Sequence, residues 1–343
     1  MSEILTRLIF GKNFYRLILS GNRCSLAKLS DMRILSIHEP GAESSNVVTE
    51  EIRKKDAKMI GRTYALEALI RKNDPLFTGE NAPSLEEVSH ILNLVEGSEI
   101  EPLPKAPLYI TTSRRAIGDF RNFIQTHENE ETYPADIRSL QRDLTNDYLQ
   151  IHEKHVCHLD SKLANYLYYE TKEGLTARAS DFGGSVFIDP TDTATLLPTE
   201  VGIDIMFADG CTPSNEINSY MEKAAKINVL IEKQDKTDED VSQIEKGKNE
   251  CLEILQKIDM FQLGVAFYQM GCKSTESLPY ECTQNQNKWV LNDPKGPLKQ
   301  ETEATLENFY QDRDKTSLIL QMLDFNPENR PTAQEVARAF AAR

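Results

Sequence analysis

The chain has 343 residues, with 39 Lys and Arg against 54 Asp and Glu, which gives a formal net charge of −15. Hydrophobic residues make up 39% and charged residues 27%, a composition typical of a folded globular protein and not of a collagen-like or disordered one. The acid excess argues against general nucleic-acid binding, because phosphate backbones repel it. The sequence contains no apolar run of about 20 residues, the length that spans a membrane. We therefore expect neither a nucleic-acid partner nor a membrane span.

The cysteines are scattered, with no CxxC pair and no Cys/His cluster. This pattern argues against a zinc site and against a disulfide framework, and it suits a reducing compartment such as the cytoplasm. The six residues are Cys24, Cys157, Cys211, Cys251, Cys272 and Cys282.

In the first third of the chain, the spacing of apolar residues changes several times between a strand-like and a helix-like pattern. Short apolar stretches within residues 1–35, separated by glycine-containing turns, predict three or four strands. From about Thr49 to Arg71 the apolar residues recur at helical spacing, which predicts a helix. A second helix is predicted over Ser84–Val95, and an apolar strand over Leu108–Thr112.

The remainder of the chain is mostly helical in pattern. A helix is predicted over 136–153, and a highly charged helical stretch over 214–257 that we expect to form a solvated hairpin. The apolar run 258–270 predicts a buried helix, and two amphipathic helices close the chain. The sequence thus indicates an α+β protein with a small β-rich part followed by a larger helical part.

Two short stretches, HLDSKLAN at 158–165 and SDFG at 180–183, carry the residue types that phosphoryl transfer needs. Such transfer needs a carboxylate to orient the attacking hydroxyl, a cation near the γ-phosphate, and oxygen ligands for Mg²⁺. The alternative is a charged turn beside an unrelated tripeptide. Each tripeptide alone is common, but their joint spacing favours the catalytic interpretation.

These stretches resemble the H-R-D-x-K-x-x-N loop and the D-F-G motif of eukaryotic-type protein kinases. The resemblance implies a bilobal kinase-like fold and ATP as the phosphate donor, with Mg²⁺ or Mn²⁺. It implies that Asp160 is the catalytic base and that Lys162 contacts the transferred phosphate. Asn165 and Asp181 would hold the metal ions. Structural support would come from His158, Phe182 and Gly183.

Two further stretches extend the resemblance toward the C-terminus. DMFQLGV at 259–265 is similar to the kinase pattern D-x-W-S-x-G-V, which implies that Asp259 steadies the catalytic loop from a buried helix. MLDFNPENRPT at 322–332 is similar to M-L-x-x-D-P-x-x-R-P-T, which implies that Arg330 pairs with a Glu ending the activation segment. Glu200 is the predicted partner. The alternative for Arg330 is an ordinary surface arginine.

In the N-terminal part the resemblance is carried by fewer residues. Lys28 ends a strand–turn–strand pattern and would bind the α- and β-phosphates, although a lysine at a strand end is often only solvated. Its predicted helical partner is Glu87, with Glu67 as the alternative. The remaining predicted ATP contacts are Thr112, Ser113 and Arg115.

Two departures from the family pattern bear on regulation. The glycine-rich loop is reduced to one glycine, Gly11, which puts the strength of nucleotide binding in doubt. Leu159 replaces the arginine that receives an activation-loop phosphate, and the segment Asp181–Glu200 is short. The departures imply activation without activation-loop phosphorylation, by another activator or through a fixed active conformation.

A cluster of positive charges falls on the helix predicted over Thr49–Arg71. One interpretation is a solvated helix face. The other is a site for a polyanionic activator, such as an inositol phosphate, an acidic lipid headgroup or a phosphorylated partner. The cluster consists of Arg53, Lys54, Lys55, Lys58 and Arg62.

The resemblance places an N-lobe at 1–112, with a helical insertion at about 36–82, and a C-lobe at 113–343, with a charged helical insertion at about 209–257. It implies a kinase that phosphorylates Ser, Thr or Tyr of a protein substrate. The alternatives are a pseudokinase scaffold and a kinase fold that transfers AMP or phosphorylates a small molecule. In its divergence the chain resembles effector kinases that bacteria such as Legionella deliver into host cells.

Overall fold

The computed structural model describes residues 4–10, 13–20, 23–28, 32–37, 44–51, 63–70, 85–96, 100–102, 108–114, 116–199, 214–285, 288–291 and 298–341. The chain divides into two compact units, Met1–Ala116 and Ile117–Arg343. The described part is α+β, with small antiparallel sheets and a mostly helical second unit, so the predicted fold class is confirmed at this level. Within the described residues, no helix combines the length and apolar character needed to cross a membrane.

The N-terminal unit begins with a three-stranded antiparallel sheet in the order β1-β2-β3. Only two residues separate β1 from β2 and β2 from β3, since apolar and β-branched residues resume almost at once after each break. The prediction of three or four strands in residues 1–35 is confirmed, and the fourth strand joins a second sheet. The strands are β1 (Ile4–Phe10), β2 (Asn13–Ser20), β3 (Arg23–Lys28) and β4 (Met32–Ile37).

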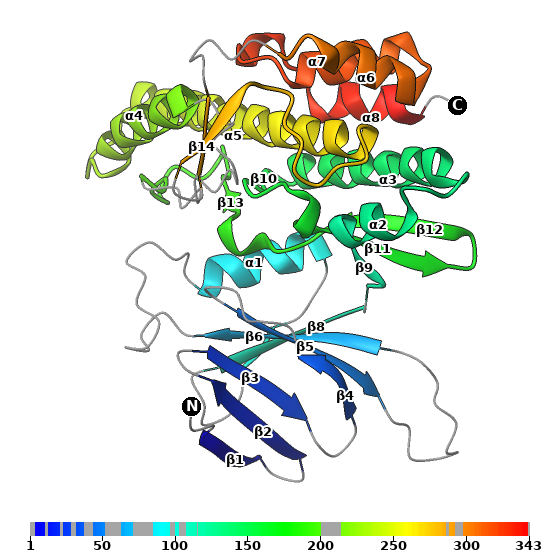
Figure 1. Cartoon of the computed structure of the whole chain (residues 1–343). Helices are drawn as coiled ribbons and strands as arrows, with labels where there is room; N and C mark the ends of the chain where they lie inside the picture. The colour runs from blue at the N-terminus through cyan, green and yellow to red at the C-terminus, as the bar shows by residue number, and fades with distance from the viewer. Residues whose placement is uncertain are drawn as a thin grey trace. The chain divides into compact units, whose positions relative to one another are not determined.

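The second sheet has five strands in the order β4-β5-β6-β8-β7 (Figure 1). The central strand β6 pairs with β5 on one side and with β8 on the other, so that Glu67 lies opposite Asn46 and Thr111. The predicted strand Leu108–Thr112 is confirmed within β8. The bounds are β5 (Ser44–Glu51), β6 (Thr63–Ile70), β7 (Ile100–Pro102) and β8 (Leu108–Arg114).

The helix predicted over Thr49–Arg71 is wrong, because both ends of that range are strands. Ala, Leu and Glu favour helices in isolation, and TYALEALI in β6 is rich in them. Pairing on both edges satisfies the backbone of this strand and overrides local propensity. Within the predicted insertion 36–82, the described residues 36–37, 44–51 and 63–70 lie in strands of the sheet, and the others lie outside the described residues.

The helix predicted over Ser84–Val95 is confirmed as α1 (Leu85–Glu96). Ile91 and Leu92 are buried, whereas His90 and Asn93 are exposed, as expected for an amphipathic helix.

The C-terminal unit is built around α3 and α5, with the last three helices gathered nearby (Figure 1). A small sheet in the order β12-β11-β9 lies against α3, whose Asp143 and Asp147 accept hydrogen bonds from the backbone of β12. The helix predicted over 136–153 is confirmed. The helices are α2 (Phe120–His127), α3 (Tyr133–Glu153), α4 (Ser214–Ile231), α5 (Asp238–Gly271), α6 (Glu301–Tyr310), α7 (Arg313–Met322) and α8 (Ala333–Ala341). The three strands are β9 (Gly118–Asp119), β11 (Tyr166–Thr171) and β12 (Gly174–Ala179).

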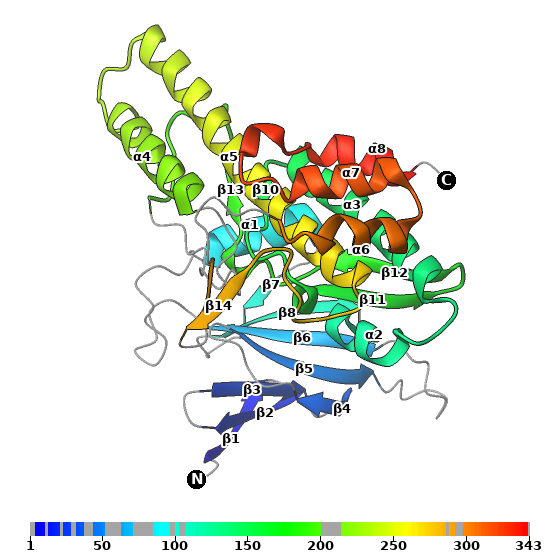
Figure 2. The same ribbon diagram turned by 45° about the horizontal axis from the view of Figure 1, so that its top comes forward.

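Helix α5 is 34 residues long and joins two features that the sequence suggested separately. Its first half forms a hairpin with α4, as predicted (Figure 2), and its second half is the predicted buried helix 258–270. A Cβ atom at Gly247 would lie 2.1 Å from Ile227 Cδ1, so this glycine permits the close approach of the two helices. A single rigid helix thus runs from the charged hairpin into the core.

Candidate active site

The loop 158–165 begins directly after β10 (Val156–Cys157) and is held by one buried carboxylate. Asp259 of α5 accepts hydrogen bonds from the backbone N–H of His158 at 2.8 Å and of Leu159 at 2.7 Å. Leu159 has a φ of 63°, a left-handed conformation that costs free energy for a branched side chain. The two hydrogen bonds hold that conformation, as the resemblance predicted for Asp259.

Gln262 makes a second attachment one helical turn further along α5. Its Oε1 accepts from the Ser161 N–H at 2.8 Å, and its Nε2 donates to the Leu159 carbonyl at 3.1 Å. Asp259 and Gln262 share one helix face because they are three residues apart. Sequence reasoning missed Gln262, although this spacing from Asp259 is a signal that could have identified it.

Two predicted catalytic residues and a predicted metal ligand meet at one carboxylate. Asp160 Oδ2 accepts from Lys162 Nζ at 2.7 Å and from Asn165 Nδ2 at 2.8 Å. Asn165 Nδ2 also donates to the Asp160 carbonyl at 2.9 Å. The side chains of Asp160 and Lys162 keep 28% and 24% of their surface exposed, so a substrate can reach them.

Asp181 directly follows Ser180, a residue that is hydrogen-bonded to this loop. Ser180 donates through its N–H at 2.8 Å and its hydroxyl at 2.9 Å to the Asn165 carbonyl. His158 Nε2 contacts the Ser180 carbonyl at 2.9 Å, and the His158 ring packs 4.8 Å from the buried Phe182 ring. Asp181 is exposed and has φ 64° and ψ 70°.

Asn165 and Asp181 provide oxygen atoms suited to a hard cation. Both donor contacts of Asn165 Nδ2 go to Asp160, which leaves the amide oxygen as the ligating atom. An amide oxygen and a carboxylate are the ligand types that Mg²⁺ and Mn²⁺ take alongside phosphate oxygens, so the residues fit the implied ion. Among the described residues, no three or more His, Cys, Asp or Glu side chains group to hold a metal by themselves.

Arg330 is a buried residue, and its carboxylate partner among the described residues is Glu216. Its guanidinium makes two hydrogen bonds to Glu216, Nη1 to Oε2 at 2.8 Å and Nη2 to Oε1 at 2.6 Å. Glu200 lies outside the described residues. Glu216 stands in the first turn of α4, where the partial positive charge of a helix start favours a carboxylate.

The predicted nucleotide contacts lie in the other unit. Lys28 ends β3, the edge strand of a sheet that does not contain β8, whereas Thr112 and Ser113 lie on β8. Glu87 lies on α1 as predicted, and its alternative Glu67 is excluded as a helix residue because it lies on β6. Arg115 and the basic cluster Arg53, Lys54, Lys55, Lys58 and Arg62 lie outside the described residues.

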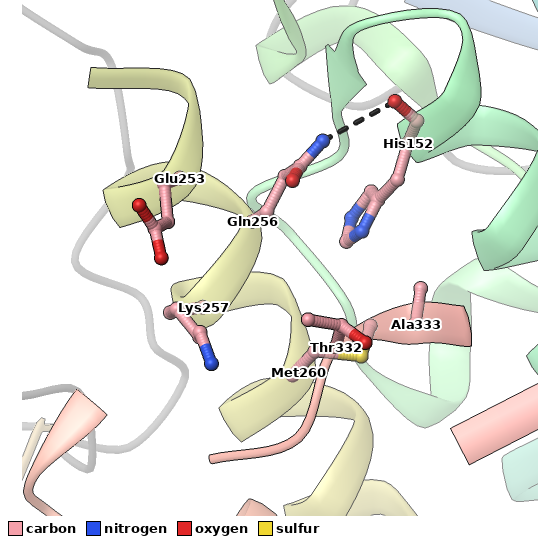
Figure 3. Close-up of a pocket in the computed structure, with 7 residues that line it drawn as sticks. All are labelled: His152, Glu253, Gln256, Lys257, Met260, Thr332 and Ala333. Atoms are coloured by element: carbon pink, nitrogen blue, oxygen red, sulfur yellow. Dashed lines mark hydrogen bonds between the residues drawn. The ribbon is translucent and has the colours of Figure 1, made fainter. Parts of the chain in front are cut away.

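His152 is a further supporting residue that sequence reasoning missed. Its Nε2 lies 2.9 Å from Asp259 Oδ2, and Gln256 Nε2 donates to its carbonyl at 3.2 Å (Figure 3). The residue lines a small pocket between α3, α5 and the start of α8. The loop is therefore supported from α3 as well as from α5. The other lining residues are Glu253, Lys257, Met260, Thr332 and Ala333.

A scan against models of protein families and a search of curated proteins both found no match to this chain.

Proposed function

We propose that the chain is a protein kinase with a bilobal kinase-like fold, which transfers the γ-phosphate of ATP to a Ser, Thr or Tyr hydroxyl. The observation that carries the proposal is the meeting of Lys162 and Asn165 at the Asp160 carboxylate. That loop is attached to Asp259 and joined through Ser180 to Asp181. Separate sequence segments thus supply, in one place, the charges that phosphoryl transfer needs.

Each residue has a definite task in this reaction. Asp160 Oδ1 makes no hydrogen bond to another described residue, so it is the oxygen that accepts the proton of the substrate hydroxyl. The hydroxyl oxygen then bonds to the γ-phosphorus as the bond to ADP breaks. Lys162 orients Asp160 and offsets negative charge on the transferred group. Asn165 and Asp181 would hold Mg²⁺ or Mn²⁺, which would supply further charge neutralisation.

Leu159 supports the part of the proposal that concerns activation. It is 2% exposed and belongs to an apolar cluster with Ile188 and Leu197. An apolar residue in this position cannot bind a phosphate, so phosphorylation of the following segment is not needed.

One observation favours a second candidate, a pseudokinase scaffold. The strand that directly precedes α1 in the five-stranded sheet is β6, and it contains Glu67 but no Lys or Arg. In kinases a lysine on the strand before this helix holds the α- and β-phosphates. Lys28 lies in the other sheet, so ATP would bind without that contact or would not bind.

Transfer from radiolabelled ATP tests both candidates. We expect Asp160→Asn to lower the transfer rate by about 10²–10⁴-fold, because the general base is lost while the shape is kept. We expect Asp181→Asn to abolish both transfer and the rise in Tm that ATP with Mg²⁺ or Mn²⁺ gives the wild type. The matched control is Asp235→Asn, an exposed residue in the turn between α4 and α5.

The label position separates the alternatives. Label transferred from the γ-position supports a kinase, and label transferred from the α-position indicates AMP transfer. Near-full activity of Asp160→Asn would contradict the catalytic assignment. Absence of transfer from either label, with no rise in Tm, would favour the scaffold. The polyanionic activator and the host-cell location stay predictions.

A further inference from the structure

The segment that follows Asp181 is attached to the core along its length. Strand β13 (Val186–Phe187) pairs with β10, and the N–H of Ile188 donates to the His155 carbonyl at 3.1 Å. From Ile188 to Pro198, here called the anchored segment, it has no regular secondary structure. Beyond Ile188, its hydrogen bonds to other elements are made with the α4–α5 hairpin.

Asn228 of α4 holds the anchored segment as a neighbouring strand would. Its Oδ1 accepts from the Leu197 N–H, and its Nδ2 donates to the Leu197 carbonyl, both at 2.8 Å. One amide side chain thereby satisfies both backbone groups of a buried residue. The Tyr220 hydroxyl adds a hydrogen bond to the next carbonyl, that of Pro198, at 2.9 Å.

Lys248 of α5 provides a second attachment. Its side chain is 2% exposed, and its Nζ donates to the Asp192 carbonyl. Desolvation lowers the pKa of Lys248, and the nearby carboxylates of Asp192 and Asp189 oppose that effect. Asp192 also accepts from the N–H of Ala194 at 2.8 Å, so the turn that presents its carbonyl is itself ordered.

Apolar packing joins the anchored segment, the α4–α5 hairpin and the loop 158–165. Ile188 and Leu197 of the anchored segment lie in one cluster with Tyr220 and Leu252 of the hairpin. Leu159 of the catalytic loop belongs to that cluster too. Movement of the hairpin would therefore disturb the segment and the loop together.

We propose that the α4–α5 hairpin is a built-in clamp that holds the anchored segment, and with it Asp181, in one conformation. Asn228 and Lys248 are then positioning residues for the reaction, a statement that rests on the proposed function. A segment attached at its far end has fewer conformations available, so the preceding Asp181 stays beside Asn165 without a modification to order it.

Hydrogen exchange measured by mass spectrometry tests the clamp without reference to activity. In the full-length protein, Asn228→Leu removes two hydrogen bonds at similar side-chain size, and Lys248→Met removes one. We expect exchange in peptides covering 188–198 to rise about tenfold in Asn228→Leu, with exchange in α3 and α8 unchanged. The controls are Asn218→Leu and Lys226→Met, exposed residues of α4.

Kinetics of the same variants test the positioning role. We expect kcat to fall about tenfold with the KM for ATP within about twofold of the wild type. Asn228→Asp keeps the acceptor for the Leu197 N–H, and we expect it to restore part of the exchange protection and part of kcat. Tyr220→Phe removes only a hydroxyl and serves where Asn228→Leu does not fold.

The outcomes are distinguishable. Unchanged exchange at 188–198 in Asn228→Leu, Lys248→Met and Tyr220→Phe would overturn the clamp. Raised exchange with unchanged kcat would overturn the positioning role. Raised exchange in a protein whose wild type transfers no phosphate would leave the clamp standing and overturn the proposed function.

Discussion

Asp259 has no exposed surface and contacts three hydrogen-bonding groups, the N–H of His158, the N–H of Leu159 and the His152 ring. A buried carboxylate is costly unless donors surround it. Here the donors are backbone groups of the catalytic loop, which would otherwise be buried without partners. The same contacts therefore offset the cost of the charge and shape the loop.

We predict that Asp259→Asn lowers the free energy of unfolding by about 2 kcal/mol or more, because one backbone N–H must then face an amide NH₂ group. Either orientation of the amide leaves His158 or Leu159 without an acceptor. Urea unfolding with an unchanged m-value would measure the loss. Asp235→Asn is the matched control, and equal stabilities of the two variants would contradict the prediction.

Helix α5 begins with a capping box. The Thr237 hydroxyl accepts from the Asp240 N–H at 3.2 Å, and Asp240 accepts in return from the Thr237 N–H at 2.9 Å. Lys233, near the start of the turn between α4 and α5, donates to Asp240 at 2.6 Å. These hydrogen bonds, with that of Lys233 first, lower the pKa of Asp240 to about 2. The cap thus connects the turn between α4 and α5 to the start of α5.

The lowered pKa gives a pH prediction for this element. Because the folded-state pKa of Asp240 lies below its ordinary value of 3.8, the cap stabilises the helix above that value and is lost as the pH falls toward about 2. We expect amide protection in the first turn of α5 to decrease over this range. In Asp240→Asn the same protection should be low and independent of pH. Equal pH dependence in both proteins would show that another group is responsible.

At the scale of the whole molecule, the ion pair of Arg330 and Glu216 joins positions 114 residues apart in the chain. Arg330 also donates through Nε to the Asp324 carbonyl at 2.6 Å and packs 4.7 Å from the Phe261 ring centre. Burial raises the pKa of Glu216 above its ordinary 4.5, and Arg330 opposes the rise without cancelling it. Desolvation therefore offsets much of the attraction.

We predict that Glu216→Gln and Arg330→Met each lower the free energy of unfolding by about 3–5 kcal/mol at neutral pH, because each leaves a buried charge unpaired. The double variant Glu216→Leu/Arg330→Met should lose less than either single one. Since a raised pKa favours the protonated form, the defect of Arg330→Met should shrink as the pH falls toward the pKa of Glu216. If urea unfolding showed that the losses of stability of the two single variants simply add in the double variant, the coupling between Glu216 and Arg330 would be contradicted.

The local sequence was sufficient to predict those features that depend on residues close together in the chain. The spacing within HLDSKLAN placed Asp160, Lys162 and Asn165 together, since residues at most five positions apart in one loop cannot lie far from one another. Helical periodicity likewise located α1, α3 and the buried part of α5.

Only the tertiary structure decided the remaining features. Residues 63–70 are a strand because β5 and β8 flank them, although the local composition favours a helix. Arg330 pairs with Glu216 because packing brings the first turn of α4 against a residue 114 positions later in the chain, a contact with no local signature. The charged hairpin, too, proved to hold the segment after Asp181. The sequence alone determined which side chains the loop carries, and packing between distant segments determined what holds that loop in place.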